Sequence, residues 1–453
     1  MKRVLTYGTF DLLHQGHLNL LRRAKALGDY FIVGVTSENY DRYRGKLNVK
    51  QSLSERIENI RATGLADEIV VEEYEGQKID DIVRMGVDVF AIGSDWTGRF
   101  DYLREYCQVV YLERTKGVSS TELRDQSHPL IHFGIAGSGR IANRFVTESK
   151  FVSGATVDGV FNVRGSSAQS FAERHELAFF SDDYQEFLSR VNAVYIASPH
   201  GTHYDYAKEA LTRGKHVLCE KPMVLAAQQA RELFDIARTR GLILMEAIKT
   251  AYCPGFQRLV SCAKSGKIGR IVSVDATFTK LVPPCSRELQ NDGVGGSVNE
   301  LATYPLLAIL KLLDMKYRDI RFLSYKNSEA GVDLFTRIDL TYPEAVATAK
   351  VGLGVKSEGS LVISGTRGYI YVPAPWWKTE YFELRYENPS ETEKNFYKFS
   401  GDGLRYEIVE FLNQIAAGQM DERMCQISGG IAGILEQYRD GNHTDIISNI
   451  QKT

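Results

Sequence analysis

Two histidines with a glycine between them follow the first apolar segment of the chain. Gly16 lies between His14 and His17, and the leucines after them have helical spacing. A helix that begins here offers free backbone N–H groups and the positive end of its dipole to a triphosphate. Two imidazoles can donate hydrogen bonds to an α-phosphate as negative charge builds during displacement. The pattern predicts nucleotidyl transfer, in which the substrate's own phosphate attacks and pyrophosphate leaves.

A second polar segment, Arg114 to Arg124, is typical of the same chemistry. Its serine and threonine hydroxyls suit the β- and γ-phosphates of a nucleotide, and the flanking arginines can pair with them. Lys46 lies in a polar stretch, residues 42–50, that could close over the same phosphates. For Asp11 and Asp95 a role in the site and a role as turn caps both stay open.

Residues 1–126 resemble the glycerol-3-phosphate cytidylyltransferase family of the HxGH nucleotidyltransferases. The likeness is carried by GTFDLLHQGHLNLL, DVFAIGSDW and CQVVYLERTKGVSST. It implies CTP with Mg²⁺ as co-substrates, and His14 and His17 as transition-state stabilisers. It also implies that Lys46 and Arg114 clamp the phosphates. The residues that the resemblance assigns to the CTP site are Thr9, Phe10, Gly16, Ser119, Ser120 and Thr121.

A glycine-rich turn marks a second binding site. Residues 131–136 read as a strand, and the six residues after them have the spacing GxGxxA. Gly137 permits a tight turn, Gly139 lets a pyrophosphate approach the backbone, and Ala142 allows close helix–strand packing. The pattern is typical of a Rossmann dinucleotide site, with cofactor contacts expected at Gly137, Gly139, Arg140 and Ile141.

The end of the next predicted strand, residues 155–161, bears on the choice of cofactor. Asn162 and Arg164 follow this strand, and neither is the carboxylate with which NAD enzymes bind the ribose 2′-hydroxyl. Arg164 can instead meet a 2′-phosphate. The sequence therefore favours NADP, with NAD left open, and expects both residues at the cofactor.

Two further polar turns follow predicted strands of the same unit. Ser198, His200 and His203 follow one strand, and the triplet Glu220-Lys221-Pro222 follows the next. Doubly wound sheets bind ligands at the carboxyl ends of their strands. Each histidine also suits a satisfied loop position. The cofactor contacts expected in these turns are Ser198, His200, His203 and Glu220.

Residues 130–453 resemble the glucose–fructose oxidoreductase, inositol dehydrogenase and MocA family. The likeness rests on the EKP triplet and on the segment Gly295 to Pro305, which resembles the family's GG…DxGxH/Y pattern with Ala302 in place of the usual glycine. It implies that Lys221 contacts the substrate's reacting oxygen and that Tyr304 holds the acid–base position. Lys221 and Tyr304 together can donate the proton and steady the alkoxide when a carbonyl is reduced. Glu300 stands where aspartate is common, and it either orients Tyr304 or binds substrate.

The apolar segments predict an α/β chain of three parts. Strands separated by helical stretches favour parallel sheets, in a Rossmann-like nucleotidyltransferase domain at 1–126 and an NAD(P)-binding Rossmann domain at 130–250. Longer, alternating strands favour a mostly antiparallel sheet in an α+β domain at 251–453, for substrate binding and oligomerisation. The expected strands are 3–7, 31–36, 68–71, 88–93, 109–112, 131–136, 155–161, 193–197, 216–220, 242–246, 271–279, 333–342, 345–353, 368–372 and 381–386, and the closing helices are 404–417 and 430–438.

The composition is that of an ordinary globular protein, with 43% hydrophobic and 25% charged residues. The formal net charge of -2 gives no broad field that attracts nucleic acid or an anionic membrane, and neither is expected as a partner. The six cysteines form no CxxC pair or histidine cluster, so we expect reduced thiols, no metal site and a cytoplasmic location. The sequence contains no apolar run of about 18 residues, so no transmembrane helix is predicted.

The two sites together predict a bifunctional enzyme that makes a CDP-alditol from a sugar or polyol phosphate, CTP and NAD(P)H. Such products feed capsule or teichoic-acid polymers in bacteria. One alternative is a cytidylyltransferase that makes CDP-glycerol from glycerol 3-phosphate beside a silent oxidoreductase scaffold. Another is an adenylyltransferase of the same superfamily. A homo-oligomer is expected, while its size, the polyol, and the order of reduction and activation stay open.

Overall fold

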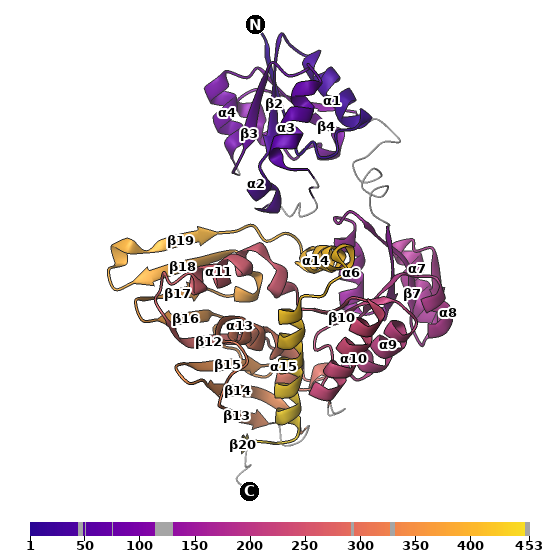
Figure 1. The fold of residues 1–453 in the computed structure, drawn as a ribbon, viewed down its shortest axis with the longest axis vertical. Helices are drawn as coiled ribbons and strands as arrows, with labels where there is room; N and C mark the ends of the chain where they lie inside the picture. The colour runs from indigo at the N-terminus through magenta and orange to yellow at the C-terminus, as the bar shows by residue number, and fades with distance from the viewer. Residues whose placement is uncertain are drawn as a thin grey trace. The chain divides into compact units, whose positions relative to one another are not determined.

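The computed structural model describes residues 1–43, 49, 51–74, 76–113, 130–290, 294–326 and 331–448. The chain divides into two units, Met1–Leu130 and Ile131–Thr453. Helices and strands alternate in the first unit and in the first part of the second (Figure 1). The α/β class predicted from the sequence is confirmed.

The N-terminal unit contains a five-stranded parallel sheet in the order β3-β2-β1-β4-β5. Successive strand residues face opposite sides of the sheet. Val4 and Val89 therefore join one apolar core with α1 and α3, whereas Leu5 and Phe90 join another with α4. The elements are β1 Arg3–Gly8, α1 Gln15–Lys25, β2 Tyr30–Thr36, α2 Glu38–Tyr43, α3 Leu53–Ala62, β3 Glu68–Glu72, α4 Gln77–Met85, β4 Val89–Gly93 and β5 Gln108–Leu112.

The second unit begins with a six-stranded parallel sheet in the order β11-β10-β9-β6-β7-β8. The chain order reverses at β6, which lies between β7 and β9. The carboxyl ends of strands at such a reversal are where open α/β sheets bind ligands. The elements are β6 Ile131–Ala136, α6 Arg140–Ser149, β7 Ala155–Phe161, α7 Gly165–His175, β8 Phe179–Ser181, α8 Tyr184–Ser189, β9 Ala193–Ile196, α9 His203–Thr212, β10 His216–Glu220, α10 Ala227–Arg240 and β11 Leu244–Ala247.

The rest of the unit forms a nine-stranded sheet among its described residues, in the order β19-β18-β17-β16-β12-β15-β14-β13-β20. The pairs β12–β15 and β13–β20 are parallel and the other pairs are antiparallel. The apolar helix α13 packs on β12 and β15, and α15 packs on α10 of the parallel sheet (Figure 1). The elements are α11 Pro254–Lys264, β12 Ile271–Thr279, α12 Ser297–Leu301, α13 Thr303–Leu313, β13 Asp319–Lys326, β14 Asp333–Thr341, β15 Val346–Gly352, β16 Leu361–Gly365, β17 Gly368–Val372, β18 Tyr381–Tyr386, β19 Glu393–Phe396, α14 Leu404–Ala417, α15 Glu422–Arg439 and β20 Thr444–Ser448.

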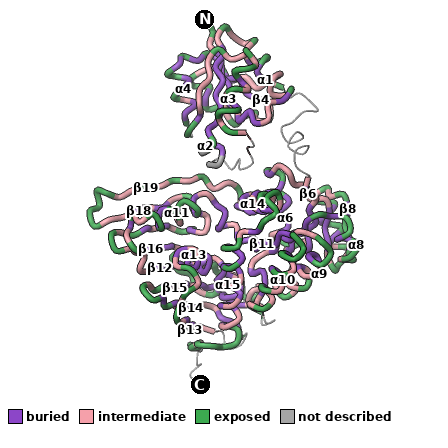
Figure 2. The backbone as a smooth tube through the Cα atoms, viewed as in Figure 1, coloured by how far each residue is buried: buried purple, intermediate pink, exposed green. Residues whose placement is uncertain are grey.

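Most expected strands are present, and the last sheet is mostly antiparallel as predicted, although it is mixed. Strands β8, β13, β16, β19 and β20 were not predicted. Figure 2 shows buried backbone concentrated inside each unit. The six cysteines are free thiols, and four of them are buried. No helix in the described ranges is long and apolar enough to cross a membrane.

An ion pair joins helix α6 to helix α14, which comes from near the end of the chain. Nε and Nη2 of Arg405 donate to the two carboxylate oxygens of Glu148, at 3.0 and 2.8 Å. Both side chains are largely buried. Such a bidentate pair fixes the relative orientation of the two helices.

We expect Arg405→Met to lower the free energy of unfolding of this unit by about 3 kcal/mol, because it leaves the Glu148 carboxylate buried and unpaired. Chemical denaturation measures the change. The double variant Glu148→Met/Arg405→Met removes both charges and is expected to recover most of the loss. A double variant that is no more stable than the single one would contradict this account.

Candidate active sites

The loop after β1 delivers His14 to the start of helix α1. Phe10 and Leu12 adopt positive φ angles of 51° and 47° in this loop. The Nδ1 atom of His14 accepts from the backbone N–H groups of Gly16 at 3.0 Å and His17 at 3.4 Å. A neutral imidazole that accepts at Nδ1 carries its proton on Nε2. His14 therefore caps the helix with one nitrogen and presents a donor with the other.

The two histidine rings lie against each other, with centroids 3.8 Å apart and planes inclined by 22°. Phe10 is buried and meets the ring of His17 edge-on, with centroids 5.5 Å apart. The HxGH residues are thus brought together as the sequence predicted. The sequence predicts that the helix start offers free N–H groups to a triphosphate, whereas in this structure the N–H groups of Gly16 and His17 donate to Nδ1 of His14.

A buried hydrogen-bond network holds the same loop in place. Thr9 donates its hydroxyl to Asp41 Oδ1 at 3.0 Å, and Nη1 of Arg56 donates to the Thr9 carbonyl at 2.9 Å and to Asp41 Oδ2 at 3.2 Å. Arg56 has no exposed surface. Asp11 is also buried and accepts from the backbone N–H of Gln51 at 3.0 Å. Asp11 and Thr9 therefore both hold the loop in place.

Several predicted phosphate contacts cannot be located beside this loop. The residues outside the described ranges are Lys46, Arg114, Ser119, Ser120 and Thr121, together with the side chain of Asp95. Sequence reasoning missed Arg56, since an arginine on a helix gives no local sign that it is buried.

The glycine turn after β6 has the shape that a dinucleotide requires. Gly137 has a φ of 112°, and a Cβ atom there would lie 2.6 Å from the carbonyl oxygen of Ala197. A Cβ atom on Gly139 would meet open space, and no side chain caps helix α6 at this residue. Backbone N–H groups at the helix start are therefore available to a pyrophosphate. Ala142 is fully buried, as the motif requires.

The end of β7 lies beside this turn. The amide nitrogen of Asn162 donates to Ser138 Oγ at 2.8 Å, and its amide oxygen accepts from the backbone N–H of Arg164 at 2.9 Å. The Arg164 side chain is exposed. The position where NAD enzymes carry a carboxylate is thus occupied by an amide next to an exposed guanidinium.

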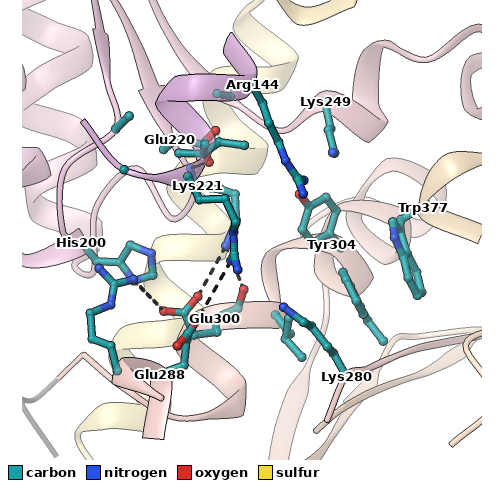
Figure 3. A pocket seen from close by; sticks show the side chains of 18 of the residues that line it. Arg144, His200, Glu220, Lys221, Lys249, Lys280, Glu288, Glu300, Tyr304 and Trp377 are labelled. Carbon is teal, nitrogen blue, oxygen red and sulfur yellow. Dashed lines mark hydrogen bonds and ion pairs between the residues drawn. The ribbon is translucent and has the colours of Figure 1, made fainter. Parts of the chain in front are cut away.

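A cavity of about 370 Å³ lies in the second unit between the parallel sheet and the nine-stranded sheet (Figure 3). Lys221, directly after β10, donates from Nζ to the backbone carbonyl of Glu300 at 2.9 Å, and its Nζ lies 3.9 Å from Glu300 Oε2. His200 Nδ1 lies 3.7 Å from Glu300 Oε1. Tyr304, on α13, lines the same cavity. The structure therefore brings Lys221 and Tyr304 together and places Glu300 beside the lysine.

The electrostatics keep a proton on Tyr304. Burial raises the pKa of its hydroxyl well above the ordinary value, and the nearby carboxyl groups of Glu220 and Glu407 raise it further. Burial also raises the pKa of Glu220, which accepts from the Tyr195 hydroxyl at 2.5 Å. A phenol with a raised pKa remains protonated and can donate to a developing alkoxide.

The two histidines predicted at this site have different surroundings. His203 is fully buried, and its ring nitrogens each lie 2.9 Å from a carbonyl oxygen, one of Pro222 and one of Ser198. It therefore ties together the turns after β9 and β10. His200 faces Glu300, and burial followed by the charge of Lys221 lowers its pKa to about 2, so its ring is neutral.

Sequence reasoning missed much of the cavity wall. Lys249 is the first residue of the short 3-10 helix Lys249–Tyr252, which comes soon after β11. Its place beyond the carboxyl end of a parallel strand was therefore a usable signal. No local pattern singles out the others, which the tertiary fold brings in. The lining residues that were not predicted include Arg144, Lys249, Phe278, Lys280, Arg287, Trp377, Lys378 and Glu407.

Comparison with protein families divides the chain in the same way as its fold. Residues 5–126 match the cytidylyltransferase-like family. Residues 131–248 match the oxidoreductase family with an NAD-binding Rossmann fold, and residues 256–371 match the GFO/IDH/MocA C-terminal domain. The chain belongs to both families. Both resemblances drawn from the sequence are confirmed, and the protein is an enzyme with a cytidylyltransferase domain and an oxidoreductase domain.

Individual relatives agree with this assignment. Glycerol-3-phosphate cytidylyltransferase of Bacillus spizizenii is 46% identical over 124 residues, which are 27% of this chain and 95% of that protein. Trans-1,2-dihydrobenzene-1,2-diol dehydrogenase of Sus scrofa is 28% identical over 321 residues, 68% of this chain and 96% of that protein. The structure of KijD10, a 3-ketoreductase from Actinomadura kijaniata in complex with NADP and TDP-benzene, has a TM-score of 0.64 and 24% identity. The match covers 70% of this chain and 99% of the KijD10 chain, which shows a common fold.

A buried carboxyl group supports the turn that carries Lys221. Glu246 on β11 accepts from the backbone N–H of Met223 at 2.9 Å, and burial raises its pKa to about 7. An unfolded chain would release this proton near the ordinary glutamate pKa of about 4.3. Between these two pKa values the folded state keeps a proton that the unfolded state has lost. The stability of the fold therefore falls as the pH rises through this range.

We expect the unfolding free energy contributed by Glu246 to be complete below about pH 4 and to fall by roughly 1.4 kcal/mol per pH unit until about pH 7. Glu246→Gln keeps the acceptor for Met223 and cannot titrate. Denaturation of both proteins between pH 5 and pH 8 measures the effect. Parallel stability profiles for the wild type and the variant would show that Glu246 does not titrate in this way.

Proposed function

We propose that the chain makes a CDP-alditol by cytidylyl transfer to a polyol or sugar phosphate and by NADP(H)-dependent reduction of the sugar carbonyl. The observation that carries the proposal is the convergence of Lys221, Glu300 and Tyr304 on one cavity, in a chain that also holds the HxGH loop. In this proposal segments 1–126, 130–250 and 251–453 act in cytidylyl transfer, cofactor binding, and substrate binding with homo-oligomerisation.

Cytidylyl transfer needs no protein nucleophile. A phosphate oxygen of the acceptor attacks the α-phosphorus of CTP and forms a new P–O bond. The bond from the α-phosphorus to the oxygen that bridges it to the β-phosphate breaks, and pyrophosphate leaves with that oxygen. The Nε2–H of His14 and the imidazole of His17 donate to the α-phosphate as charge builds. Mg²⁺ enters with CTP, since it binds substrate phosphates with few protein ligands. The residues proposed to hold the remaining phosphates and the nucleotide are Thr9, Phe10, Gly16, Lys46, Arg114, Ser119, Ser120 and Thr121.

The reduction site uses its own residues around a dinucleotide. When bound, NADPH supplies the hydride for the carbonyl carbon. Tyr304 donates the proton to the carbonyl oxygen, Lys221 steadies the alkoxide, and Glu300 positions Lys221. The residues proposed to hold the cofactor are Gly137, Gly139, Arg140, Ile141, Asn162, Arg164, Ser198 and His200, with Glu220 and His203 fixing the turns around it.

NADP is the proposed cofactor for two reasons. Asn162 replaces the carboxylate that would repel a 2′-phosphate, and the exposed Arg164 can pair with that group. The 3-ketoreductase of the same fold was solved with NADP. Comparing NADPH with NADH as reductants of the same substrate tests the choice directly.

The proposed acceptor is a less common polyol phosphate. Glycerol 3-phosphate is the acceptor named for the cytidylyltransferase relatives. A dedicated reductase on the same chain would add nothing if cells already supply that compound. A ketose phosphate of five or six carbons therefore fits better as the precursor, and its CDP-alditol would serve capsule or teichoic-acid synthesis. A cytoplasmic location, where CTP and NADPH are made, suits both reactions.

We expect His14→Ala to abolish pyrophosphate release and to leave NADPH oxidation nearly intact, because the two sites lie in separate sheets. His14→Asn provides the matched control, since its amide oxygen can still cap helix α1. We expect it to be as inactive as the alanine variant, by at least about 10²-fold. Pyrophosphate release by His14→Asn at the wild-type rate would mean that His14 acts only as a helix cap.

We expect Lys221→Ala to slow reduction by roughly 10²–10⁴-fold, the usual contribution of a positioned acid–base group, while cytidylyl transfer survives. Lys150→Ala, at an exposed lysine of the same unit that does not line the cavity, is the matched control. Steady-state oxidation of NADPH measures both. Near-wild-type reduction by Lys221→Ala would remove this lysine from the chemistry, and no NADPH oxidation by the wild type with any ketose phosphate would favour the silent scaffold.

A further inference from the structure

The part of the cavity around Tyr304 is rich in basic side chains. Figure 3 shows Arg144, Lys249 and Lys280 reaching into the cavity around Tyr304 from different elements. Seven basic side chains line the cavity as a whole, against four carboxyl groups. Basic groups therefore outnumber carboxyl groups in the cavity lining, which suits an anionic substrate.

Few partners neutralise these cations. The Nζ atom of Lys249 donates to the backbone carbonyl of Asp402 at 2.7 Å. The carboxylate of Asp402 is shared, lying 3.5 Å from Nε of Arg144 and 4.0 Å from Nζ of Lys378. Lys280 has no carboxylate within ion-pair distance among the described residues. The carboxyl groups of Glu407 and Glu220 also act on Lys249, and burial raises the pKa of both. Asp402 is thus the one carboxylate in ion-pair distance of Arg144 and Lys378 among the described residues.

The aromatic wall of the cavity is already packed against itself. The rings of Phe278 and Trp377 stack with centroids 3.7 Å apart and planes inclined by 12°. Phe278 also meets Tyr304, with centroids 5.3 Å apart, and a Cβ atom added to Gly359 would lie 3.0 Å from the Trp377 indole. The stack occupies one face of the Phe278 ring and one face of the Trp377 indole, which leaves less aromatic surface for a cytosine ring to stack on.

We propose that the reductase site takes the ketose as its free phosphate monoester, with Arg144, Lys249, Lys280 and Lys378 holding the phosphate dianion, so that reduction precedes cytidylyl transfer. This inference rests on the proposed function. The hydride of NADPH and a proton from Tyr304 convert C=O to CH–OH, and the phosphate stays intact. That phosphate then attacks the α-phosphorus of CTP, and pyrophosphate leaves.

The first test compares three forms of one ketose in NADPH oxidation: the unphosphorylated sugar, its phosphate and its CDP adduct. We expect kcat/KM to be at least about tenfold higher for the phosphate than for either other form. A CDP adduct reduced as well as the phosphate would overturn the inference and leave the bifunctional assignment standing. If none of the three forms of any ketose tried is reduced, both the inference and the bifunctional assignment are overturned.

The second test replaces the basic group without a carboxylate partner. We expect Lys280→Met to raise KM for the ketose phosphate about 10- to 100-fold, because a charge-assisted contact to phosphate is lost, with KM for NADPH unchanged. Lys316→Met, at an exposed lysine outside the cavity, is the matched control and is expected to behave as the wild type. Thermal unfolding of each variant reports folding. A Lys280→Met variant with an unchanged KM for the phosphate, or with an equal rise for the unphosphorylated ketose, would refute the subsite.

Discussion

The hydrogen bond from Lys221 to the backbone carbonyl of Glu300 connects the two parts of the oxidoreductase unit. Lys221 directly follows β10 of the parallel sheet, whereas Glu300 lies on α12 beside the nine-stranded sheet, 79 residues further along the chain. Tyr304 follows on α13, so the same contact sets where the lysine ammonium and the tyrosine hydroxyl stand relative to each other. The lining of the cavity is complete only when both parts are folded and packed together.

Histidines fix the backbone at both sites. His14 uses Nδ1 to cap α1, which leaves Nε2–H as a donor of known direction. His203 has no exposed surface and lies between the carbonyl groups of Ser198 and Pro222. In both cases an imidazole contacts the backbone of a loop at the carboxyl end of a parallel strand, where the proposed sites lie. Replacing either ring therefore changes geometry as well as reactivity.

The sequence predicts best where a motif directly adjoins a regular element. Gly137 and Lys221 both follow short apolar strands, so their places at the sheet edge could be inferred. Helix α15 was expected from residue 430 but begins at Glu422, because Asp421 caps it and two consecutive glycines, Gly429 and Gly430, hide the helical pattern. Such a boundary depends on a cap that composition alone does not reveal.

The basic wall around Tyr304 shows the other limit of sequence reasoning. Lys280 follows β12 and Lys378 follows a tryptophan pair, so they are far apart in sequence and meet only in the nine-stranded fold. Arg56 is similar, since its burial beneath the HxGH loop depends on β1 and β2 lying side by side. The charge of a cavity depends on the tertiary structure, and no local sequence pattern shows which basic residues will lie together.

The central claim is that one chain both reduces and activates its substrate. The most direct measurement incubates the full chain with CTP, Mg²⁺, NADPH and a panel of ketose phosphates of three to six carbons, and identifies CDP-linked products by mass. The account predicts a CDP-alditol that forms only when CTP and NADPH are both present, with more product from a pentulose or hexulose phosphate than from dihydroxyacetone phosphate. CDP-glycerol made from glycerol 3-phosphate, with no NADPH-dependent product from any ketose phosphate, would contradict it.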